Sequence, residues 1–594
     1  MMTLSLRHSY QALALITLLF CIGVTAHSQE SEPNADEPSV LDPNTTATID
    51  ADLDLTPDLL PSTVPKAALT RADLDAMKAA REEEKKEYSP FSRQELGLTL
   101  PRASAMKVVR VTLDFNPQVL TQDQTVRGSA GFVQVQQGVF DTHVTGRIAP
   151  NLELNDRSIT NRANPSQSPA PTPYPNPLRA RRSVSEYELG VRKMLENGII
   201  INPSVGFSHR ADTDYGDFTN ENQGTVNFAV TIPLARGGGT LSNKAPEIAA
   251  RFDLLASTLQ LRHITSQSVL AVLRAYWSCK AAEEIYKLRV ESEAIATRLL
   301  GVGESLVEGD ELAPAQLPQI LADRDSTAAI RIQSEAELIA SRQNLATTMG
   351  FAASSLLLAP LAKDEFPMPP EKEIFPQVQS LIDTALALRD DLRASRQTVK
   401  SKKVLMDASY LNLRPIINLE LVASYLPLEN RNSSTITTGN TWQGRAGFTL
   451  DWPVENNEAI GNVIQSQAAY ETSQISVADT ERQIVSEVIT TLTGLRAAAM
   501  NVELYRESVR WNKSALDAQE QLFALGQGSL TDTITARQRF VDAQVSYVLA
   551  RQNYANFLVQ LRFATGTLFF ADREGNWIDQ NVWNIVPFAG GKKR

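Results

Sequence analysis

The side chains that could catalyse a reaction or bind a metal are few and scattered in this sequence. Beyond residue 27 the histidines are His143, His209 and His263, and none has a second histidine at the i, i+4 spacing of a helical metal site. The run Gly237–Gly239 lacks the Lys-Ser/Thr of a phosphate-binding loop, so we interpret it as a flexible joint. The acid pair Glu283 and Glu284 is expected on a solvated helix face. The sequence therefore predicts no enzyme, no cofactor and no metal site.

Other acidic side chains stand beside two glycine-containing turns. Asp310 and Glu311 follow Gly309, and Asp532 follows the turn Gly526–Gly528. A carboxylate near the start of a helix complements the helix dipole. Taken alone, these residues predict helix starts just after each turn.

The two turns belong to an apparent internal duplication. From Gln521 to Leu568 the sequence predicts a helix end, a turn, and a new helix capped by the hydroxyl of Ser529 or Thr531. Residues 305–350 show the same order, and in both stretches about forty residues separate the turn glycine from a closing glycine. We interpret each stretch as part of a helical hairpin.

Composition favours long helices and excludes one class of partner. Of 594 residues, 43% are hydrophobic and only 7% aromatic, which suits long amphipathic helices better than several thick globular cores. The net charge of −11 argues against nucleic acid, because phosphate binding needs clustered Lys and Arg.

The N-terminus has the parts of an export signal. Arg7 and His8 precede an apolar run, Ala12–Val24, and cleavage is expected after Ala26 or Ser28. We therefore assign residues 1–28 to a signal peptide and 29–95 to an acidic, flexible N-terminal extension. The run is too short to span a membrane as a helix.

Several later segments alternate between apolar and polar residues. Examples are Asn227–Ile232, Ile417–Tyr425 and Arg445–Trp452. Such alternation is typical of outer-membrane strands and equally of any half-buried antiparallel sheet. We expect four strands within about 139–234 and two within about 416–453. If these strands form a barrel, whether the additional hairpin of the first set, Ser185–His209, joins its wall is open.

The expected connections favour the membrane alternative. Long loops are predicted at Asn164–Pro177, Asp212–Asn222 and Leu428–Asn440, whereas Glu196–Gly198 reads as a tight turn. Long loops on one side and short turns on the other are typical of bacterial barrels.

Each set of strands is followed by a long helix. Apolar residues recur at every seventh position, at Val488, Leu495, Val502, Val509, Leu516 and Phe523, which predicts helices supercoiled against neighbours. Each helix should reach sixty-odd residues, roughly 90–100 Å. The resulting domains are a first repeat at 96–350, a linker at 351–377, a second repeat at 378–568 and a C-terminal tail at 569–594. In this pairing Asp390-Asp391-Leu392 takes the place of Asn116-Pro117-Gln118.

Taken in order, these motifs resemble the TolC-like outer-membrane efflux protein family over roughly residues 98–568. The residues that carry the resemblance are Asn116-Pro117, Ile232-Pro233-Leu234 with Arg236 to Gly239, Trp452-Pro453-Val454 with Asn456-Asn457, Gly526 to Ala536, and Ala564-Thr565-Gly566. The ending Pro233-Leu234-Ala235-Arg236-Gly237 is similar to a branch of the family with an added hairpin.

The resemblance implies a mixed α and β fold of two internal repeats. A long coiled-coil α-helical barrel in the periplasm would join a transmembrane antiparallel β-barrel that is completed by trimerisation. The implied function is the outer-membrane channel-tunnel of a tripartite export system, a passive exit duct for small molecules, drugs or metals. Its implied partners are two further copies, a periplasmic adaptor, an inner-membrane transporter and outer-membrane lipid. The cargo cannot be read from the sequence.

The resemblance also implies two sites. Asp532 matches the first residue of an acidic pair that narrows the periplasmic entrance, whereas Thr535 replaces the second acid and Gly528 replaces an often basic residue. A ring of carboxylates selects cations and can bind divalent ions. The candidates for contact with the adaptor are the turn residues Gly309, Asp310, Glu311, Gly526, Gln527 and Gly528.

Two alternatives stay open. One is an outer-membrane duct of a type I polypeptide secretion system. The other is a periplasmic coiled-coil scaffold that is not a channel and whose strands form a soluble domain.

Overall fold

The computed structural model describes nine stretches of the chain, all within the unit formed by residues 64–594. They are residues 102–157, 178–214, 217–309, 316–369, 376–431, 436–525, 527–568, 570–572 and 575–577. The predicted signal peptide, N-terminal extension and most of the C-terminal tail lie outside them, and so does the predicted loop Asn164–Pro177. The internal duplication and the domain boundaries stay predictions.

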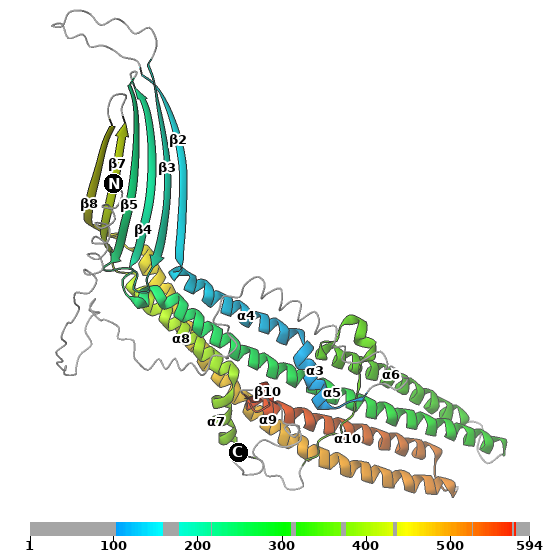
Figure 1. Ribbon diagram of the computed structural model, residues 1–594. Helices are drawn as coiled ribbons and strands as arrows, with labels where there is room; N and C mark the ends of the chain where they lie inside the picture. Colours follow the sequence, from blue (N-terminus) through cyan, green and yellow to red (C-terminus); the bar gives the residue numbers. More distant parts are fainter. Residues whose placement is uncertain are drawn as a thin grey trace, which may run out of the picture. The chain divides into compact units, whose positions relative to one another are not determined.

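Helices and strands follow one another in a similar order in the two halves (Figure 1). The first half contains β1 (Arg102–Ala103), α3 (Ala105–Phe115), α4 (Pro117–Gln137), β2 (Thr142–Arg157), β3 (Leu178–Met194), β4 (Ile200–Asp214), β5 (Asp217–Pro233), α5 (Thr240–Glu308), α6 (Leu317–Met349) and β6 (Leu361–Ala362). The second contains α7 (Val378–Leu388), α8 (Asp390–Leu411), β7 (Ile416–Arg431), β8 (Ile436–Asp451), α9 (Asn457–Ala524), α10 (Leu530–Ala564), β9 (Phe570–Asp572) and β10 (Gly575–Trp577). The described chain is thus mixed α and β, and mostly helical.

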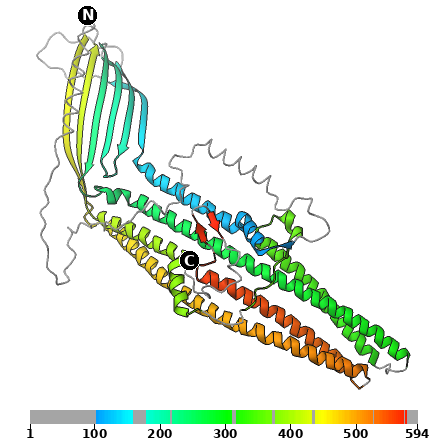
Figure 2. The same cartoon turned by 60° about the horizontal axis from the view of Figure 1, so that its bottom comes forward.

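The long strands form one antiparallel sheet in the order β2-β3-β4-β5-β7-β8. The expectation of four strands and then two is confirmed, and the hairpin of β3 and β4 joins the same sheet as the others. Strand β5 pairs with β7 through partners such as Val230 and Leu421, which connects the two halves of the chain. Helices α4, α5, α8 and α9 all meet the sheet at the same end (Figures 1 and 2).

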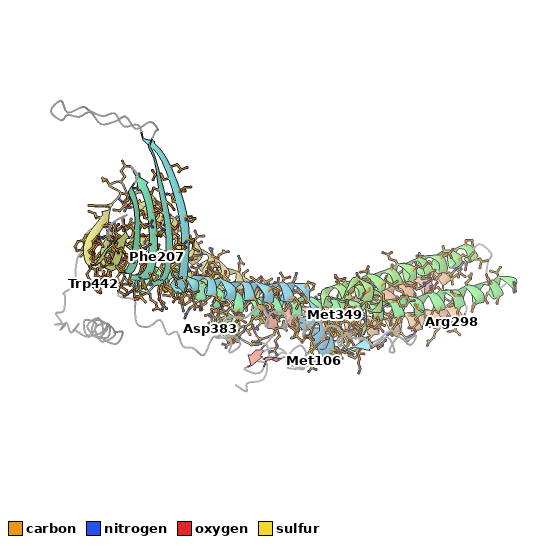
Figure 3. The ribbon with its side chains drawn as sticks, turned by 45° about the horizontal axis from the view of Figure 1, so that its top comes forward. Met106, Phe207, Arg298, Met349, Asp383 and Trp442 are labelled. Atoms are coloured by element: carbon orange, nitrogen blue, oxygen red, sulfur yellow. The ribbon has the colours of Figure 1, made fainter. Side chains whose placement is uncertain are left out.

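The sheet has one apolar and one polar face. Directly paired residues of antiparallel strands point to the same side, and the pairs Ile148–Tyr187 and Leu419–Phe448 fix the apolar side. The exposed large apolar side chains of the described strands all belong to it: Val144, Ile148, Leu152, Leu154, Tyr187, Leu189, Val205, Phe207, Val226, Phe228, Leu421, Ile436, Trp442, Phe448 and Leu450. Figure 3 labels Phe207 and Trp442 on this sheet.

Two predicted loops are mostly strand. Strands β4 and β5 extend through most of the predicted loop Asp212–Asn222. In the predicted loop Leu428–Asn440, β7 continues to Arg431 and β8 begins at Ile436. Polar residues led the sequence analysis to end the strands too early. Strand pairing is made by the backbone, so polar side chains beyond the apolar stretch do not prevent it. The tight turn at Glu196–Gly198 is confirmed, with Gly198 at φ +88°.

The strand-to-helix connection after β5 has a specific backbone shape. Gly237 and Gly239 have φ of +84° and +94°, in a region that side chains with a Cβ rarely adopt. The Asn243 side chain donates hydrogen bonds of 2.8 Å to the carbonyl oxygens of both. A Cβ on Gly198 would lie 2.2 Å from the Gly237 oxygen. These glycines are therefore required by the backbone shape of the turn, and the interpretation as a flexible joint stays a prediction.

The long helices match the predicted length and seam. Helix α5 has 69 residues and α9 has 68. Of the seven-residue positions, Val488, Leu495, Val502 and Leu516 are buried, as a supercoiled seam requires, whereas Val509 and Phe523 are only half-buried. One apolar core surrounds Trp277 and includes Met349, with Met106 packed against it; Figure 3 labels both methionines. A second core contains α7 and the seam of α9.

Two kinks interrupt the shorter helices, and they correct the predicted pairing by one residue. Asn116, between α3 and α4, has φ −65° and ψ 123°, and Arg389, between α7 and α8, has φ −62° and ψ 118°. Arg389 is therefore the counterpart of Asn116, and Asp390 that of Pro117. The Asn116 side chain accepts from the backbone N–H of Gln118 at 2.9 Å, a cap that arginine cannot form.

The small parallel pair β1 and β6 is fixed by a buried tyrosine. The hydroxyl of Tyr276, on α5, accepts hydrogen bonds from the backbone N–H groups of Lys363 (3.0 Å) and Asp364 (2.9 Å). It donates one to the carbonyl oxygen of Ala103 at 3.2 Å. One side chain thus holds the segments next to both strands against the middle of α5.

Candidate functional site

Those gate and adaptor-contact candidates that are described lie at the ends of two helical hairpins. The first hairpin is formed by α5 and α6, and the second by α9 and α10. Gly309, Gln527 and Gly528 are described. Asp310, Glu311 and Gly526 lie outside the described residues.

The turn of the second hairpin requires glycine at position 528. The N–H groups of Gln527 and Gly528 both donate to the carbonyl oxygen of Leu522 at 2.9 Å. A Cβ on residue 528 would stand 2.6 Å from the backbone nitrogen of Phe523, closer than real contacts allow. The turn geometry therefore excludes a basic side chain here.

The predicted helix cap is not formed by a side chain. Ser529 occupies the N-cap position of α10 with an extended backbone, but its hydroxyl makes no capping hydrogen bond. Its carbonyl oxygen accepts from the N–H of Thr533 at 3.1 Å. Thr531 instead pairs with the exposed Gln319 of α6, whose amide nitrogen lies 3.0 Å from the Thr531 hydroxyl. Both predicted capping interactions were therefore wrong, and one of them is replaced by a contact between hairpins.

The two gate candidates differ in their surroundings. Asp532 is exposed in the first turn of α10. Thr535 is half-buried, and its hydroxyl donates to the carbonyl oxygen of Thr531 at 2.8 Å. Asp532 is therefore available to ions or to another chain, whereas the Thr535 hydroxyl is already bonded within its own helix.

Close to the same tips lies a buried ion pair that the sequence analysis missed. The Arg537 guanidinium of α10 contacts the Asp323 carboxylate of α6, and these residues are only 5% and 6% exposed. The Gln538 amide donates to the other oxygen of Asp323 at 3.0 Å. Arg537 stands between the buried Ile534 and Val541 in a helical spacing. The sequence does contain one signal of this ion pair: Arg537 is a charged residue at a position where the helical spacing expects an apolar one.

A small apolar cluster lies beside this pair. Ile320 of α6 packs with Leu530 and Ile534 of α10. A Cβ on Gly303 of α5 would stand 2.5 Å from the Cδ1 of Ile320, so α5 and α6 approach closely there. The ion pair and the apolar cluster together connect the two hairpins near their ends.

Further polar contacts connect the hairpins along α5 and α10. Arg551 of α10 contacts the Glu284 carboxylate, and Arg289 lies 3.3 Å from Asp542. Neither Glu283 nor Glu284 is solvated as predicted. The reason is that the middle of α5 is covered on several sides, a property that the sequence of one helix does not reveal.

Glu283 is held ionised by its neighbours despite burial. Burial alone would raise its pKa, but Lys287 at 2.7 Å and Arg102 at 2.5 Å stabilise the carboxylate, and the net effect lowers the pKa. It therefore acts as a structural anion between α5 and the segment that precedes α3.

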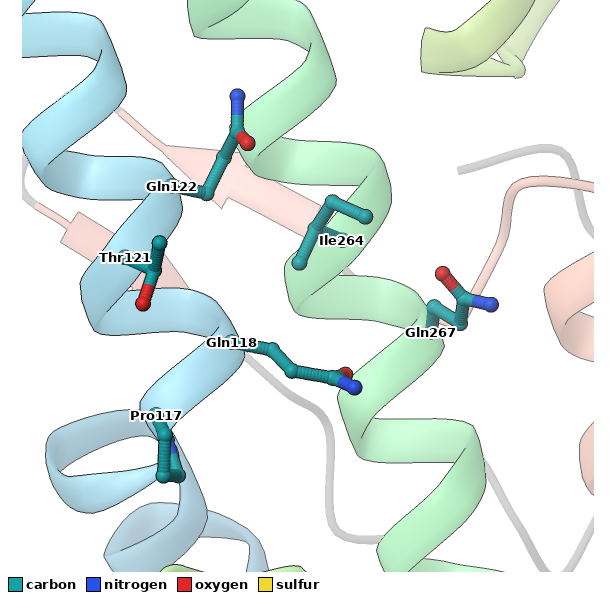
Figure 4. Close-up of a pocket in the computed structure, with 6 residues that line it drawn as sticks. All are labelled: Pro117, Gln118, Thr121, Gln122, Ile264 and Gln267. Atoms are coloured by element: carbon teal, nitrogen blue, oxygen red, sulfur yellow. The ribbon is translucent and has the colours of Figure 1, made fainter.

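The described residues offer little for metal or small-molecule chemistry. Among them, no three or more of His, Cys, Asp and Glu gather where they could hold a metal ion. One open groove of about 390 Å³ lies between α4 and α5 (Figure 4). It is lined by Pro117, Gln118, Thr121, Gln122, Ile264 and Gln267. Of the helices that are described, none is both long and apolar enough to cross a membrane.

Comparison with known proteins shows which family the chain resembles. Residues 381–567 match the family described as outer membrane efflux protein. The chain is 24% identical over 312 residues to the outer membrane protein TolC of Vibrio cholerae, a match that spans 50% of this chain and 68% of that one. The predicted resemblance to the TolC-like outer-membrane efflux proteins is thereby confirmed.

Solved structures show that the fold is shared. The CmeC outer membrane channel of Campylobacter jejuni is 14% identical with a TM-score of 0.58, over 78% of this chain and 85% of that one. The outer membrane protein VceC of Vibrio cholerae is 12% identical with a TM-score of 0.54, over 78% and 96%. The likeness to outer membrane efflux proteins supports an outer-membrane location for this chain.

Proposed function

We propose that the protein is the passive exit duct of a tripartite export system that moves small molecules, drugs or metals. In this proposal three copies form one channel, which works with a periplasmic adaptor and an inner-membrane transporter. The observation that carries the proposal is the two-faced sheet, whose strands continue at one end into helices of 69 and 68 residues.

The apolar face has the dimensions of a membrane band. On β7 the apolar positions run from Ile417 to Tyr425, about 27 Å along the strand, and on β2 from Val144 to Leu154, about 34 Å. Strands tilted by about 40° project these lengths to roughly 20–26 Å, close to the ~25 Å apolar band of outer-membrane barrels.

Closure between copies follows from the two outermost strands. In a bilayer the unpaired backbone groups of β2 and β8 need partners, and β8 of one copy paired with β2 of the next would supply them. Both strands have 16 residues, and both carry apolar side chains on the same face of the sheet. Three copies of a six-stranded sheet then form the transmembrane β-barrel.

The widths of the sheet and of the helical wall agree with this closure. The helices adjoining the sheet pack in the order α4, α5, α8 and α9, and at about 9 Å each they cover about 36 Å. Six strands about 4.8 Å apart and tilted by about 40° cover about 38 Å. The six-stranded sheet therefore continues the helical wall without a step in width.

Cysteine crosslinking tests the closure. The side chains of the apolar face are at even-numbered positions in β2 and in β8. Thr145 of β2 and Thr449 of β8 are at odd-numbered positions, so both lie on the polar face. We assume that β2 of one copy pairs antiparallel with β8 of the next, and that the strand ends next to the helices lie at the same height. Thr145→Cys and Thr449→Cys should then crosslink between copies. The control pair Thr145→Cys and Leu450→Cys points to opposite faces and should not. Equal crosslinking of both pairs, or of neither, would contradict the barrel.

We place the gate of the duct at Asp532 and Thr535. Support comes from the exposure of Asp532 and from its position next to the contacts between Gln319 and Thr531 and between Asp323 and Arg537. In the trimer, Asp532 supplies one carboxylate from each copy, a ring that attracts cations. With Thr535 bonded to its own helix, each copy contributes one acid in place of a pair.

We assign contact with the adaptor to the hairpin turns. The residues are Gly309, Asp310, Glu311, Gly526, Gln527 and Gly528, at the ends of the helices farthest from the sheet along the chain. Crosslinking from Gln527, followed by identification of the co-purified periplasmic protein, tests the assignment.

Two alternative functions predict different outcomes. A type I polypeptide secretion duct would have the same barrel but would co-purify with a secretion transporter and its polypeptide. A periplasmic scaffold without a channel would stay soluble without detergent and would form no heat-modifiable trimer. Solubility without detergent would overturn the duct proposal.

A further inference from the structure

Helices α4 and α9 are the two outer helices of the wall that adjoins the sheet. In that wall α4 packs against α5, and α9 packs against α8. Helix α4 leads into β2 and α9 follows β8, and these are the two outermost strands of the sheet. The whole of α4 is described, and no residue of it is buried. Each outer helix therefore has a side that the single copy leaves uncovered.

The uncovered side of α4 follows the heptad spacing of a coiled coil. Its positions recur in alternating steps of four and three residues, and all are exposed: Thr121, Thr125, Gly128, Phe132 and Val135. Phe132 and Val135 are 52% and 65% exposed, and a Cβ on Gly128 would meet no atom within 4 Å. Apolar and small residues at this spacing form the seam between two supercoiled helices. We call these five residues the α4 seam.

The part of α9 next to the sheet has a seam of the same kind. Its positions recur in steps of three and four residues, and all are exposed: Gly461, Ile464, Ala468, Glu471 and Ile475. Ile464 and Ile475 are 62% and 67% exposed. Large apolar side chains left in water at this spacing indicate a surface for another helix. We call these five residues the α9 seam.

The two seams match layer by layer in an antiparallel arrangement. Helix α4 runs toward the sheet and α9 runs away from it, so copies joined through β2 and β8 bring these helices together antiparallel. When Phe132 is placed opposite Ile464, each step along one seam meets an equal step along the other. The layers are then Val135 with Gly461, Phe132 with Ile464, Gly128 with Ala468, Thr125 with Glu471, and Thr121 with Ile475.

The flanks of the two seams raise no electrostatic obstacle to this pairing. No layer contains two charges, and the hydroxyl of Thr125 can donate to the carboxylate of Glu471. In a coiled coil, the residues beside the seam decide which helices pair through their charges. Here the flanking residues are all uncharged: Gln122, Gln124, Ser129, Gly131, Gln465, Gln467, Thr472 and Gln474.

The heights of the two seams also agree. Val135 lies in the last turn of α4, and Gly461 lies in the second turn of α9. The seams therefore begin at the same distance from their helix ends next to the sheet, to within about one turn or 5 Å. The pairing of α4 with α9 thus continues the pairing of β2 with β8.

We propose that α4 of one copy and α9 of the next form an antiparallel coiled coil in which Phe132 lies opposite Ile464. The partner of each seam is a second copy of this chain, so the proposal rests on the three-copy duct proposed above. It adds a register between copies that strand pairing alone does not set. Because each copy offers one seam on each side, the contact repeats from copy to copy and closes into a ring.

Cysteine crosslinking of the assembled protein tests the register. Gly128→Cys with Ala468→Cys places both thiols in one layer of small residues, and mild oxidation should give disulfide-linked copies on a non-reducing gel. Two control pairs change only the second position, to another exposed alanine of α9. Ala469→Cys moves the thiol about 100° around the helix, and Ala478→Cys moves it about 15 Å along the seam. Neither should crosslink with Gly128→Cys.

The strand pair Thr145→Cys and Thr449→Cys separates failure of the register from failure of the duct. Crosslinking of the strand pair, with Gly128→Cys and Ala468→Cys no more reactive than the controls, would overturn the register and leave the barrel standing. If neither the strand pair nor the helix pair crosslinks, both proposals are overturned. The wild type supplies the baseline, because its Cys279 is buried.

An exchange of charges supplies a second measurement. Phe132→Glu places a carboxylate opposite Ile464 and should lower the temperature at which the trimer dissociates in detergent. Adding Ile464→Lys should recover most of that loss, because the two charges then face each other. Adding Ile475→Lys, about 16 Å farther along α9, should not. An unchanged dissociation temperature in Phe132→Glu, or equal effects of the two lysines, would overturn the register.

Discussion

Asp323 and Arg537 form a buried ion pair that joins α6 to α10 near the ends of the two helical hairpins. The two residues stand 214 positions apart in the chain. Removing one partner of such a pair leaves an uncompensated buried charge.

Arg537→Met should therefore destabilise the protein by about 3–5 kcal/mol. The double variant with Asp323→Leu should recover most of that loss, because no buried charge is left. Thermal unfolding of the detergent-solubilised protein measures both. Arg506→Ala, which breaks an exposed pair with Glu503, should cost no more than about 0.5 kcal/mol.

Asp532→Ala should change the single-channel conductance, lower the cation selectivity and weaken block by divalent cations, because it removes one carboxylate per copy from the proposed gate. Thr535→Asp should have the opposite effect, since it restores a second acid. Planar-bilayer recordings distinguish these outcomes. Unchanged conductance and divalent block in Asp532→Ala would show that this residue does not line the constriction.

Gly528→Ala should destabilise the second hairpin turn, because its Cβ would stand 2.6 Å from the Phe523 nitrogen. Gly301→Ala is the matched control: it lies inside α5, and its Cβ would meet no atom within 4 Å. The control should be stabilising by about 0.5–1 kcal/mol. A Gly528→Ala variant with wild-type melting temperature would contradict the turn geometry.

Tyr276→Phe should destabilise the protein by about 1–3 kcal/mol, because it removes the hydroxyl that accepts from the backbone N–H of Asp364 and donates to the carbonyl oxygen of Ala103. Burial raises the pKa of the Tyr276 hydroxyl above its ordinary value, so this contribution should not change between pH 6 and 9. Melting temperatures across that range check both statements. Tyr505→Phe, at an exposed position, should have little effect.

Cys279 should resist thiol reagents in the folded protein at pH 7.5. It is fully buried, and burial raises its pKa to about 11, so almost no reactive thiolate forms. Mass spectrometry after maleimide treatment should find it unlabelled until the protein is unfolded. Labelling at the rate of an exposed thiol would show that the helices around it open readily.

The regular elements were predictable because their signals are local. The seam containing Val488, Leu495 and Val502 follows a seven-residue spacing, and the strand alternation marks the apolar face. The tight turn at Gly198 is similarly visible in its residues. In each case the structure is decided by residues that are close in the sequence or that recur at a constant spacing.

The missed features depend on residues that are distant in sequence. Nothing near Asp323 reveals Arg537, and nothing near Glu284 reveals Arg551. The strand ends beyond Asp212 and Leu428 were misjudged because backbone pairing with a distant partner extends a strand through polar residues. The one-residue error at Arg389 arose because its ionic contacts replace a recognisable asparagine cap.

The outermost strands β2 and β8 have a consequence for the life of the newly made chain. Each offers 16 residues of backbone that are paired on one side only among the described strands, next to exposed side chains such as Ile148 and Trp442. Long, apolar strand edges are sites of aggregation. A single copy is therefore at greatest risk between synthesis and assembly, and we expect its production to depend on a chaperone that shields these edges until the copies meet.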